Sequence, residues 1–280
     1  MRGGNGDDDL TLGLGNDIAF GGDGHDSVRG GDDDDYIDGW NGADKLWGDD
    51  GDDVILGWNG NDIMYGGLGN DVLRGEQDND KLYGGNGDDE IYGEDGNDKI
   101  SAGQGSDVID GGAGSDIING NNGDDFISGG LNNDAIRGGG GNDAVSGDGG
   151  NDNLFGDSGD DIMSGGVGRD KLTGGTGADI FVVNEGDGAD TVMDFNTAED
   201  QIDLTSYLLP YYGGEFPPFL DGEFFLSIPY EEYVSEVNGN VVFDFGSGDT
   251  LTLKNTSLAD LSEANFVLED YVPWVPEVLG

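Results

Sequence analysis

Gly66-Gly67-Leu68-Gly69-Asn70-Asp71-Val72-Leu73-Arg74 shows the pattern that decides the fold of this chain. The nine positions read Gly-Gly-x-Gly-x-Asp-x-apolar-x. The pattern recurs without insertion or deletion from residue 3 to residue 182, which makes 20 copies. Its sixth position is Asp in every copy. A period this strict over this length predicts a repeat architecture in which similar units stack on one another.

The eighth position of the repeat is apolar in every copy, from Leu10 to Phe181, and only Ala19 is small. One large apolar residue in nine cannot form a helix face, which needs one every three or four residues. The spacing suits a short strand in each repeat whose apolar side chain points inward. We therefore expect six residues of turn to alternate with three residues of strand, and the strands to stack as coils.

Glycine dominates the other fixed positions. Position 1 is Gly except at Leu12 and Ala102. Position 4 is Gly except where it is Asp33, Asp78 or Asn132. Asp and Asn are the residues that best tolerate a positive φ after Gly, so position 4 is expected in a left-handed turn conformation. Position 2 accepts larger side chains and is expected to face solvent.

The Asp at position 6 and the carbonyl groups of the turn supply oxygen atoms only. Oxygen ligands in a flexible, high coordination number suit Ca²⁺ better than Mg²⁺ or the soft metals. A turn alone would also accept Asn, Ser or Gly at this position. The sequence therefore predicts a calcium ladder. Its metal ligands are Asp8, Asp17, Asp26, Asp35, Asp44, Asp53, Asp62, Asp71, Asp80, Asp89, Asp98, Asp107, Asp116, Asp125, Asp134, Asp143, Asp152, Asp161, Asp170 and Asp179.

The pattern resembles the RTX (repeats-in-toxin, haemolysin-type) calcium-binding nonapeptide, and the match covers about two thirds of the chain. The resemblance implies an all-β fold, a parallel β-roll (right-handed β-solenoid) of about ten two-repeat coils. Odd copies would form one sheet and even copies the other. Each Ca²⁺ would lie between one turn and the next turn on the same side.

The charge agrees with a cation-filled roll. The chain has a net charge of −51, which argues against nucleic acid and anionic membranes as partners. Residues 1–182 hold 41 acidic and nine basic residues, a net charge of −32. Nine gaps on each side would hold up to about 18 ions and bring about +36. Such a chain is expected to stay unfolded in the low-calcium cytosol and to fold outside the cell.

Residues 183–280 lack the ninefold period and are expected to form a C-terminal β-rich domain that caps the open stack. Strand-like runs lie at residues 180–183, 191–195, 201–204, 224–228, 240–245 and 250–254. Residues 207–233 are expected to form an irregular loop, and Ser257 is expected to cap a short helix with Leu258 and Leu261 inward. Residues 190–195 with 200–204, and 248–253 with 257–266, resemble the flank of type I-secreted RTX proteins. That resemblance implies a bacterial, extracellular location and a secretion signal near the C-terminus.

Five aromatic residues mark a candidate binding surface. Trp47, Tyr65 and Tyr83 occupy position 9 of repeats 5, 7 and 9, and Trp40 and Trp58 occupy position 2 of repeats 5 and 7. If position 9 faces outward, they form a strip that can stack on sugar rings or contact a protein. The alternative is a cross-strand stacking ladder that only stabilises the sheet.

Catalytic motifs are missing from the sequence. The chain has no Cys and a single His, His25, at position 5 of a turn, where a solvated side chain is expected. We therefore expect no enzyme activity.

The predicted function is a secreted calcium-binding β-roll with a structural or interaction role, exported by a type I secretion apparatus. The alternative is a carbohydrate-binding accessory module of a larger secreted enzyme, an epimerase or protease, whose catalytic part is absent. Membrane insertion is not expected, because the chain lacks the apolar helices that a haemolytic toxin needs.

Overall fold

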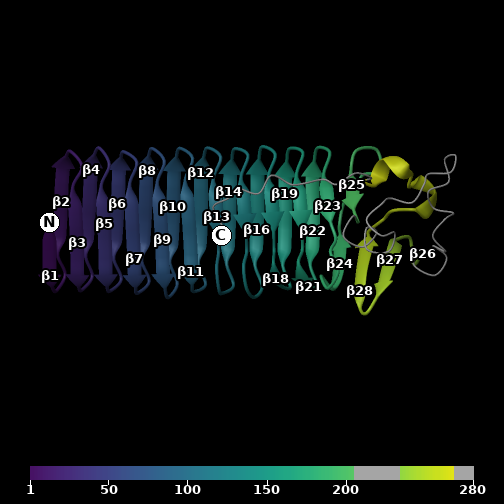
Figure 1. Ribbon diagram of the computed structural model, residues 1–280, viewed down its shortest axis with the longest axis horizontal. Coiled ribbons are helices and arrows are strands. Elements are labelled where there is room, and N and C mark those ends of the chain that lie inside the picture. Colours follow the sequence, from purple (N-terminus) through teal and green to yellow (C-terminus); the bar gives the residue numbers. More distant parts are fainter. Residues whose placement is uncertain (205–233, 268–280) are drawn as a thin grey trace, which may run out of the picture.

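The structure, a computed structural model, describes residues 1–204 and 234–267. These residues form a long stack of short strands that begins at the N-terminus and meets a smaller β unit at its other end (Figure 1). The chain alternates between two sheets, so that each coil contributes one strand to each wall of the stack.

The two walls are a 12-stranded and a 14-stranded sheet. The first runs β1 (Arg2–Asn5), β3 (Ile18–Asp23), β5 (Tyr36–Asn41), β7 (Val54–Asn59), β9 (Val72–Gln77), β11 (Glu90–Asp95), β13 (Val108–Asp110), β15 (Phe126–Ser128), β17 (Ala144–Ser146), β20 (Ile162–Ser164), β23 (Ile180–Val182) and β25 (Gln201–Asp203). The second runs β2 (Asp9–Leu14), β4 (Ser27–Asp32), β6 (Lys45–Asp50), β8 (Ile63–Leu68), β10 (Lys81–Asn86), β12 (Lys99–Gln104), β14 (Ile117–Asn122), β16 (Ala135–Gly140), β19 (Asn153–Ser158), β22 (Lys171–Thr176), β24 (Ala189–Val192), β28 (Asp249–Leu253), β27 (Val241–Gly246) and β26 (Val234–Glu236). The remaining described elements are β18 (Gly149–Gly150), β21 (Val167–Gly168), and the 3-10 turns η3 (Leu258–Asp260) and η4 (Glu263–Asn265).

Strand pairing along the roll is parallel with a register of two repeats. Leu82 lies opposite Met64 on one side and Ile100 on the other, each exactly two repeats away along the chain. The same step relates β1 to β3 and β20 to β23. The prediction of an all-β, parallel β-roll is therefore confirmed.

Most strands are longer than the three residues expected. A typical strand such as β8 has six residues and runs from position 7 of one repeat to position 3 of the next. The glycine-rich backbone at positions 1 to 3 keeps the parallel pairing, as Gly67 opposite Gly85 shows. Strands of three residues occur in β13, β15, β17, β20 and β23. Because a long strand crosses the repeat boundary, positions 2 and 9 of one repeat belong to different sheets.

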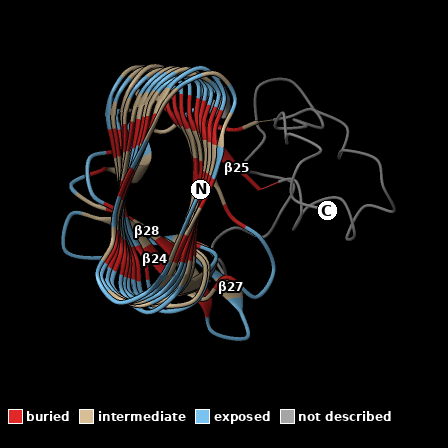
Figure 2. Cartoon of the chain, turned by 90° about the vertical axis from the view of Figure 1, so that its left-hand side faces the viewer, coloured by how far each residue is buried: buried red, intermediate tan, exposed pale blue. Residues whose placement is uncertain are grey.

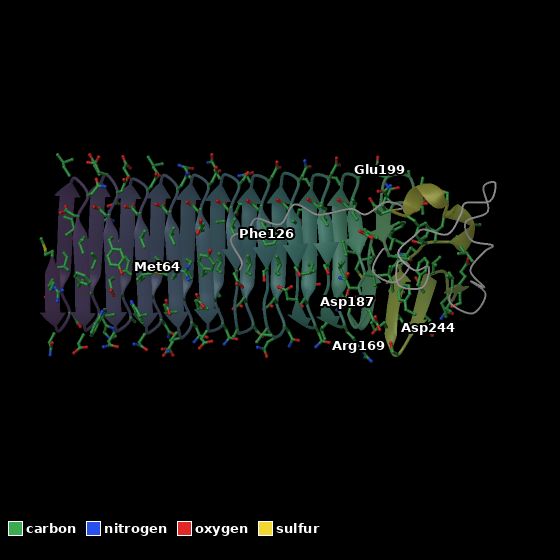
Figure 3. The ribbon with its side chains drawn as sticks, viewed as in Figure 1. Met64, Phe126, Arg169, Asp187, Glu199 and Asp244 are labelled. Carbon is green, nitrogen blue, oxygen red and sulfur yellow. The ribbon has the colours of Figure 1, made fainter. Side chains whose placement is uncertain are left out.

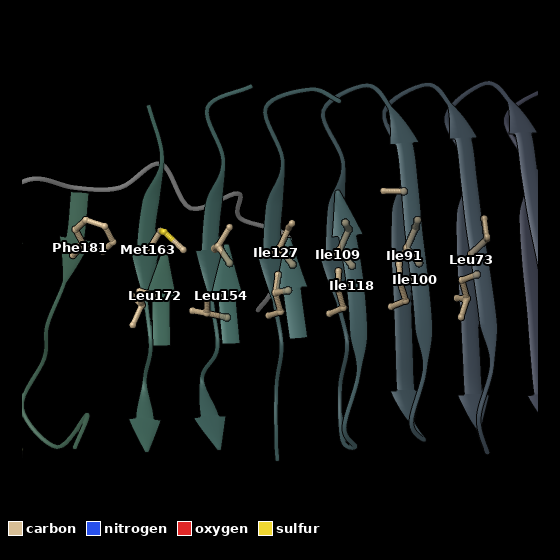
Figure 4. Packing of buried hydrophobic residues seen from close by; sticks show 14 of the residues in the cluster. Leu73, Ile91, Ile100, Ile109, Ile118, Ile127, Leu154, Met163, Leu172 and Phe181 are labelled. Atoms are coloured by element: carbon tan, nitrogen blue, oxygen red, sulfur yellow. The ribbon is translucent and has the colours of Figure 1, made fainter. Parts of the chain in front are cut away.

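The core is a column of position 8 side chains between the two sheets. Ile91, Leu73 and Ile109 have no exposed surface, and Ala19 and Phe181 are buried as well. In successive coils, position 8 side chains such as Leu73, Ile91 and Ile109 lie side by side in a row along the stack (Figure 4). Viewed along the stack, the outer bends of the turns are exposed and the buried residues lie in the walls (Figure 2). The inward direction predicted for position 8 is confirmed.

The backbone is left-handed at two positions of the repeat. Position 4 has a positive φ as predicted, with values of 77° at Asp33 and 78° at Asn132. Position 2 also has a positive φ, which the sequence did not suggest for residues such as Trp40 (80°) and Trp58 (75°). An L-residue in this conformation costs about 1 to 2 kcal/mol. The side chains at both Trp positions face solvent, as expected.

Arginines on the outer faces connect pairs of neighbouring coils. The guanidinium of Arg29 lies 4.7 Å from the centre of the Trp47 ring, and its Nη1 lies 3.0 Å from Asp49 Oδ1. The same spacing along the chain recurs in the sets Arg74, Tyr92 and Glu94, and Arg137, Phe155 and Asp157. Each exposed ion pair contributes little alone, since surface pairs are worth about 0 to 1 kcal/mol. The cation–π contact adds roughly 0.5 to 1 kcal/mol.

The two sheets continue past Val182. β24 and β25 pair in parallel with β22 and β23, and β28 then continues the 14-stranded sheet before β27 and β26 add antiparallel strands. Five expected strands are confirmed with shifted ends, as β23, β24, β25, β27 and β28, and β26 was not expected. The strand expected at residues 224–228 and the loop expected at residues 207–233 lie outside the described residues.

The expected helix after Ser257 is a single 3-10 turn. Ser257 Oγ accepts a hydrogen bond from the Ala259 amide at 3.3 Å, which confirms its capping role. Leu258 and Leu261 are partly buried against the core.

Candidate metal centres

The Asp residues at position 6 form two ladders, one along each edge of the roll. Odd repeats contribute Asp8, Asp26, Asp44, Asp62, Asp80, Asp98, Asp116, Asp134, Asp152 and Asp170. Even repeats contribute Asp17, Asp35, Asp53, Asp71, Asp89, Asp107, Asp125, Asp143, Asp161 and Asp179. All except Asp8 and Asp17 are buried. The turn side chains outside the ladders project from the long edges of the roll (Figure 3).

One oxygen of each ladder carboxylate is hydrogen-bonded and the other is not. The Asp26 amide donates to Asp44 Oδ1 at 2.7 Å, and the Asp44 amide donates in the same way to Asp62 Oδ1 at 2.7 Å. Oδ2 of Asp44 is buried with no hydrogen-bond partner, and the same holds for every ladder Asp of the repeats except Asp17 and Asp179. A buried unpaired oxygen is costly, more so when it is charged. Nearly every turn therefore presents an acceptor that the protein itself leaves unsatisfied.

Position 1 glycines leave space beside these oxygens. A Cβ placed on Gly39 would lie 2.6 Å from Asp44 Oδ2 and 3.0 Å from the carbonyl oxygen of Gly57, the equivalent glycine one coil further on. The same two kinds of oxygen surround the Cβ position of Gly21. Glycine is required at this position because the two oxygens approach the place where a Cβ atom would lie. Any larger residue would put its side chain into the space between these oxygens.

The donor set fits a hard cation. No three His, Cys, Asp or Glu side chains converge on one point within residues 1–204 and 234–267. An ion between the turns would therefore take carboxylate oxygens together with main-chain carbonyls, and Ca²⁺ accepts six to eight such ligands in flexible geometry. Asp44 and the carbonyl of Gly57 are representative of the residues that would hold it.

Burial raises the pKa of the ladder carboxyls. The pKa of Asp80 is raised to about 9, chiefly by desolvation; the Asp62 backbone hydrogen bond lowers it and the charges of Asp62, Asp98 and Asp78 raise it. The same cause raises the pKa of Asp125 to about 8. Without a cation, the folded roll therefore holds its ladder carboxyls in the neutral form more readily than the unfolded chain does.

A second ladder, which the sequence reasoning missed, runs along position 5. Asn70 Oδ1 accepts a hydrogen bond from the Asp88 amide at 2.9 Å, and Asp88 Oδ1 accepts one from the Ser106 amide at 2.8 Å. His25 is exposed, as expected, and its Nδ1 accepts from the Ala43 amide at 2.8 Å. The frequency of Asn and Asp at position 5 was the available signal. These side chains connect each turn to the next turn on the same edge of the roll.

The position 6 ladders extend one step beyond the nonapeptides. The Asp170 amide donates to Asp190 Oδ1 at 3.0 Å, and the Asp179 amide donates to Asp200 Oδ1 at 3.2 Å. Both added carboxylates are buried. Each of these steps is longer than two repeats, so a search in ninefold register does not find them.

The five aromatic candidates lie on opposite sheets, which corrects the prediction of one strip. Trp47, Tyr65 and Tyr83 stack on the 14-stranded sheet, with ring centroids 5.8 and 4.9 Å apart and interplanar angles of 6° and 10°. Trp40 and Trp58 lie opposite each other on the 12-stranded sheet. The first three rings thus form the cross-strand ladder that the alternative interpretation expected.

The family described as RTX calcium-binding nonapeptide repeat (4 copies) matches overlapping segments that together span residues 1–192. No curated protein matches the chain.

Solved structures with similarity to the chain include two subunits of a mannuronan C5-epimerase from Azotobacter vinelandii. The AlgE6R3 subunit is 26% identical with a TM-score of 0.37, over 54% of this chain and 87% of that chain. The AlgE6R2 subunit is 24% identical with a TM-score of 0.35, over 53% of this chain and 94% of that chain. The extracellular lipase LipA from Serratia marcescens is 19% identical with a TM-score of 0.37, over 74% of this chain and 40% of that chain.

Acidification is expected to stabilise the metal-free roll. The pKa of a ladder carboxyl such as Asp71 is about 8 in the folded roll. In an unfolded chain the pKa of Asp is about 3.9. Between these values the folded state binds more protons, so its stability rises as pH falls through that window. In chelator, circular dichroism should therefore show a gain of β structure from about pH 8 to about pH 5. A metal-free chain that loses β structure over that range contradicts the burial of these carboxyls.

The role of the space beside position 1 in calcium binding can be tested by adding or removing a methyl group there. Gly39→Ala should remove or weaken one calcium site, because the added Cβ lies between the two bordering oxygens. Gly140→Ala is the matched control, since its nearest described neighbour would lie 3.5 Å away. Ala102→Gly should conversely strengthen a site, because Ala102 stands where other repeats have this glycine. Calorimetric titration that finds equal calcium binding in all three variants would contradict this assignment.

Proposed function

Because the chain belongs to the family of RTX calcium-binding nonapeptide-repeat proteins, we propose that it is a secreted β-roll that folds when the two Asp ladders bind Ca²⁺ outside the cell. In this proposal the roll has a structural or interaction role, and its ligands are the ladder Asp side chains with the neighbouring main-chain carbonyls. Asp190 and Asp200 would add one site at the end of each ladder.

The observation that carries the proposal is the buried, unpartnered Oδ2 at successive rungs, as at Asp44 and Asp53. Binding a cation there would satisfy an acceptor that folding has removed from water, so the binding free energy becomes folding free energy. Each rung is hydrogen-bonded to the next, which favours cooperative folding along the stack. Extracellular calcium modules bind at about 10⁻⁴ to 10⁻³ M, so the chain would fold only where calcium is abundant.

The expected number of bound ions follows from the number of gaps between successive turns on each edge of the roll. Nine gaps on each edge give up to about 18 ions, and steps to Asp190 and Asp200 would add about one on each edge. The repeat region carries a net charge of −32, which such a number of divalent cations neutralises. Charge balance therefore supports occupancy of most gaps.

Export in the unfolded state fits this chemistry. We assign residues 1–182 to the roll and residues 183–280 to a capping and secretion-signal domain, with a bacterial type I apparatus as the exporting partner. In the described part of the chain no helix is long and apolar enough to cross a membrane. The acidic surface disfavours nucleic acid as a partner.

A second candidate is a carbohydrate-binding accessory module of a larger secreted enzyme, such as an epimerase or protease. The exposed Trp40 and Trp58 favour it, because an aromatic side chain at a surface offers a large apolar face on which a sugar ring can stack. We propose no catalytic residue in this chain under either function.

Replacing one central ladder carboxylate should weaken calcium-dependent folding. Asp80→Asn should raise the Ca²⁺ midpoint several-fold and lower the cooperativity, because its Oδ2 is buried and unpartnered. Asp88→Asn is the matched control, since Asp88 is exposed and an Asn amide oxygen serves the same role at Asn70. Circular dichroism across a Ca²⁺ titration measures both. Identical midpoints for the two variants would count against the ladder as the calcium site.

Secretion is testable in cells. The full chain co-expressed with a type I apparatus should reach the medium, and a chain ending at residue 182 should remain inside. Cells without the apparatus and a cytosolic marker control for lysis. Equal release with and without the apparatus, or release of the truncated chain, would refute the assignment of residues 183–280.

A further inference from the structure

The outer face of the 12-stranded sheet carries a repeated tetrapeptide that lies outside the Asp ladders. Residues 39–42 and 57–60 both read Gly-Trp-Asn-Gly. Pairing of β5 with β7 places Trp40 opposite Trp58 and Asn41 opposite Asn59. These four side chains line a surface hollow of about 230 Å³. The sheet therefore displays the same aromatic and amide groups twice, one coil apart.

Trp40 and Trp58 have an unfavourable backbone conformation and exposed side chains. Trp40 and Trp58 have φ values of 80° and 75°, a conformation that bulky residues rarely adopt. Their surfaces are 52% and 42% exposed. Neither ring makes a ring–ring or cation–π contact with any residue that the structure describes. Backbone strain without a compensating internal contact points to a role in binding.

A buried carboxylate stands beside the first of these indoles. Asp38 is 5% exposed and its Oδ1 has no hydrogen-bond partner. It precedes Trp40 by two positions in β5, so both share the outer face of that strand. Trp58 follows Asp38 by 20 residues and lies on the neighbouring strand. Arg74 and Glu94 have the same separation and form an ion pair between neighbouring strands. Asp38 is not among the residues that line the hollow, so its carboxylate adds negative charge near the site without itself offering a contact surface.

The stacked rings on the other sheet lack such a site. Tyr65 lies between Trp47 and Tyr83, both nearly parallel to it, so both of its faces are covered. Arg29 covers Trp47. A sugar ring stacks on an open aromatic face, and the middle of this ladder offers none.

We propose that Trp40 and Trp58 bind an uncharged polysaccharide, with sugar rings against the indoles and hydroxyl groups hydrogen-bonded to Asn41 and Asn59, the other residues that line the hollow. Apolar ring faces combined with a few amide and carboxylate groups suit this ligand class. A polymer of repeating units matches a site that is repeated in two neighbouring coils. The net charge of −51 would fall only to about −15 with about 18 bound Ca²⁺, and this remaining negative charge disfavours a polyuronate. The inference rests on the proposed function in one respect, because the site exists only in the folded roll.

The test uses the full chain at saturating Ca²⁺ with a soluble, uncharged β-linked glucan as probe. A polyuronate and a cationic aminoglycan serve as comparison polymers. Trp40→Asn and Trp58→Asn should each weaken glucan binding about tenfold, the loss of one aromatic contact. Asn already occupies position 2 at Asn121, so the calcium midpoint should stay the same or fall. Trp47→Ala is the control that should leave glucan binding unchanged. Affinity electrophoresis and calorimetry measure binding, and circular dichroism measures folding.

Several outcomes would overturn the proposal. One is a folded, calcium-loaded chain that ignores the glucan or prefers the polyuronate. Another is a loss of binding in Trp47→Ala as large as in Trp58→Asn. If Trp58→Asn changes only self-association in sedimentation, the hollow is a protein interface and the glycan proposal is wrong. A chain that shows no β signal with Ca²⁺ would instead refute the calcium-folded roll itself.

Discussion

Along both edges of the roll, the turns leave one carboxylate oxygen buried beside a main-chain carbonyl with no protein donor to satisfy it. The unpartnered Oδ2 recurs at every repeat Asp of the ladders except Asp17 and Asp179. Burial raises the pKa of these groups, as at Asp80, because the charged form has lost its water. A divalent cation shared between turns is the simplest way to satisfy many such oxygens at once. The fold and the proposed function therefore depend on the same interaction.

The other contributions to stability are modest for each coil. Two apolar side chains, such as Leu73 and Leu82, fill the core of one coil. Backbone strain at position 2 opposes folding, while the position 5 hydrogen bonds and the arginine contacts offset part of it. Each coil touches only its neighbours, so stability accumulates along the stack. Without cations, the ladder charges oppose that accumulation.

The period and the residues at its fixed positions predicted stacked coils of short strands, the inward position 8, the left-handed position 4 and the position 6 ladder, and the resemblance to the RTX nonapeptides supplied the parallel β-roll. It could not predict that strands cross the repeat boundary, since pairing of the glycine backbone leaves no side-chain signal. For that reason Trp40 and Trp47, from one repeat, lie on opposite sheets. Asp190 and Asp200 were missed as ladder members because insertions change their spacing while their hydrogen bonds to Asp170 and Asp179 persist. The left-handed φ of Trp58 was unexpected because Trp has no intrinsic preference for it.

The most direct test of the central claim is small-angle scattering of the full chain at neutral pH, in chelator and across a Ca²⁺ titration. The account predicts an expanded chain in chelator that converts cooperatively to a compact, elongated particle as Ca²⁺ reaches about 10⁻⁴ to 10⁻³ M, with Mg²⁺ far less effective. A chain that is already compact in chelator, with scattering unchanged by Ca²⁺, would contradict it.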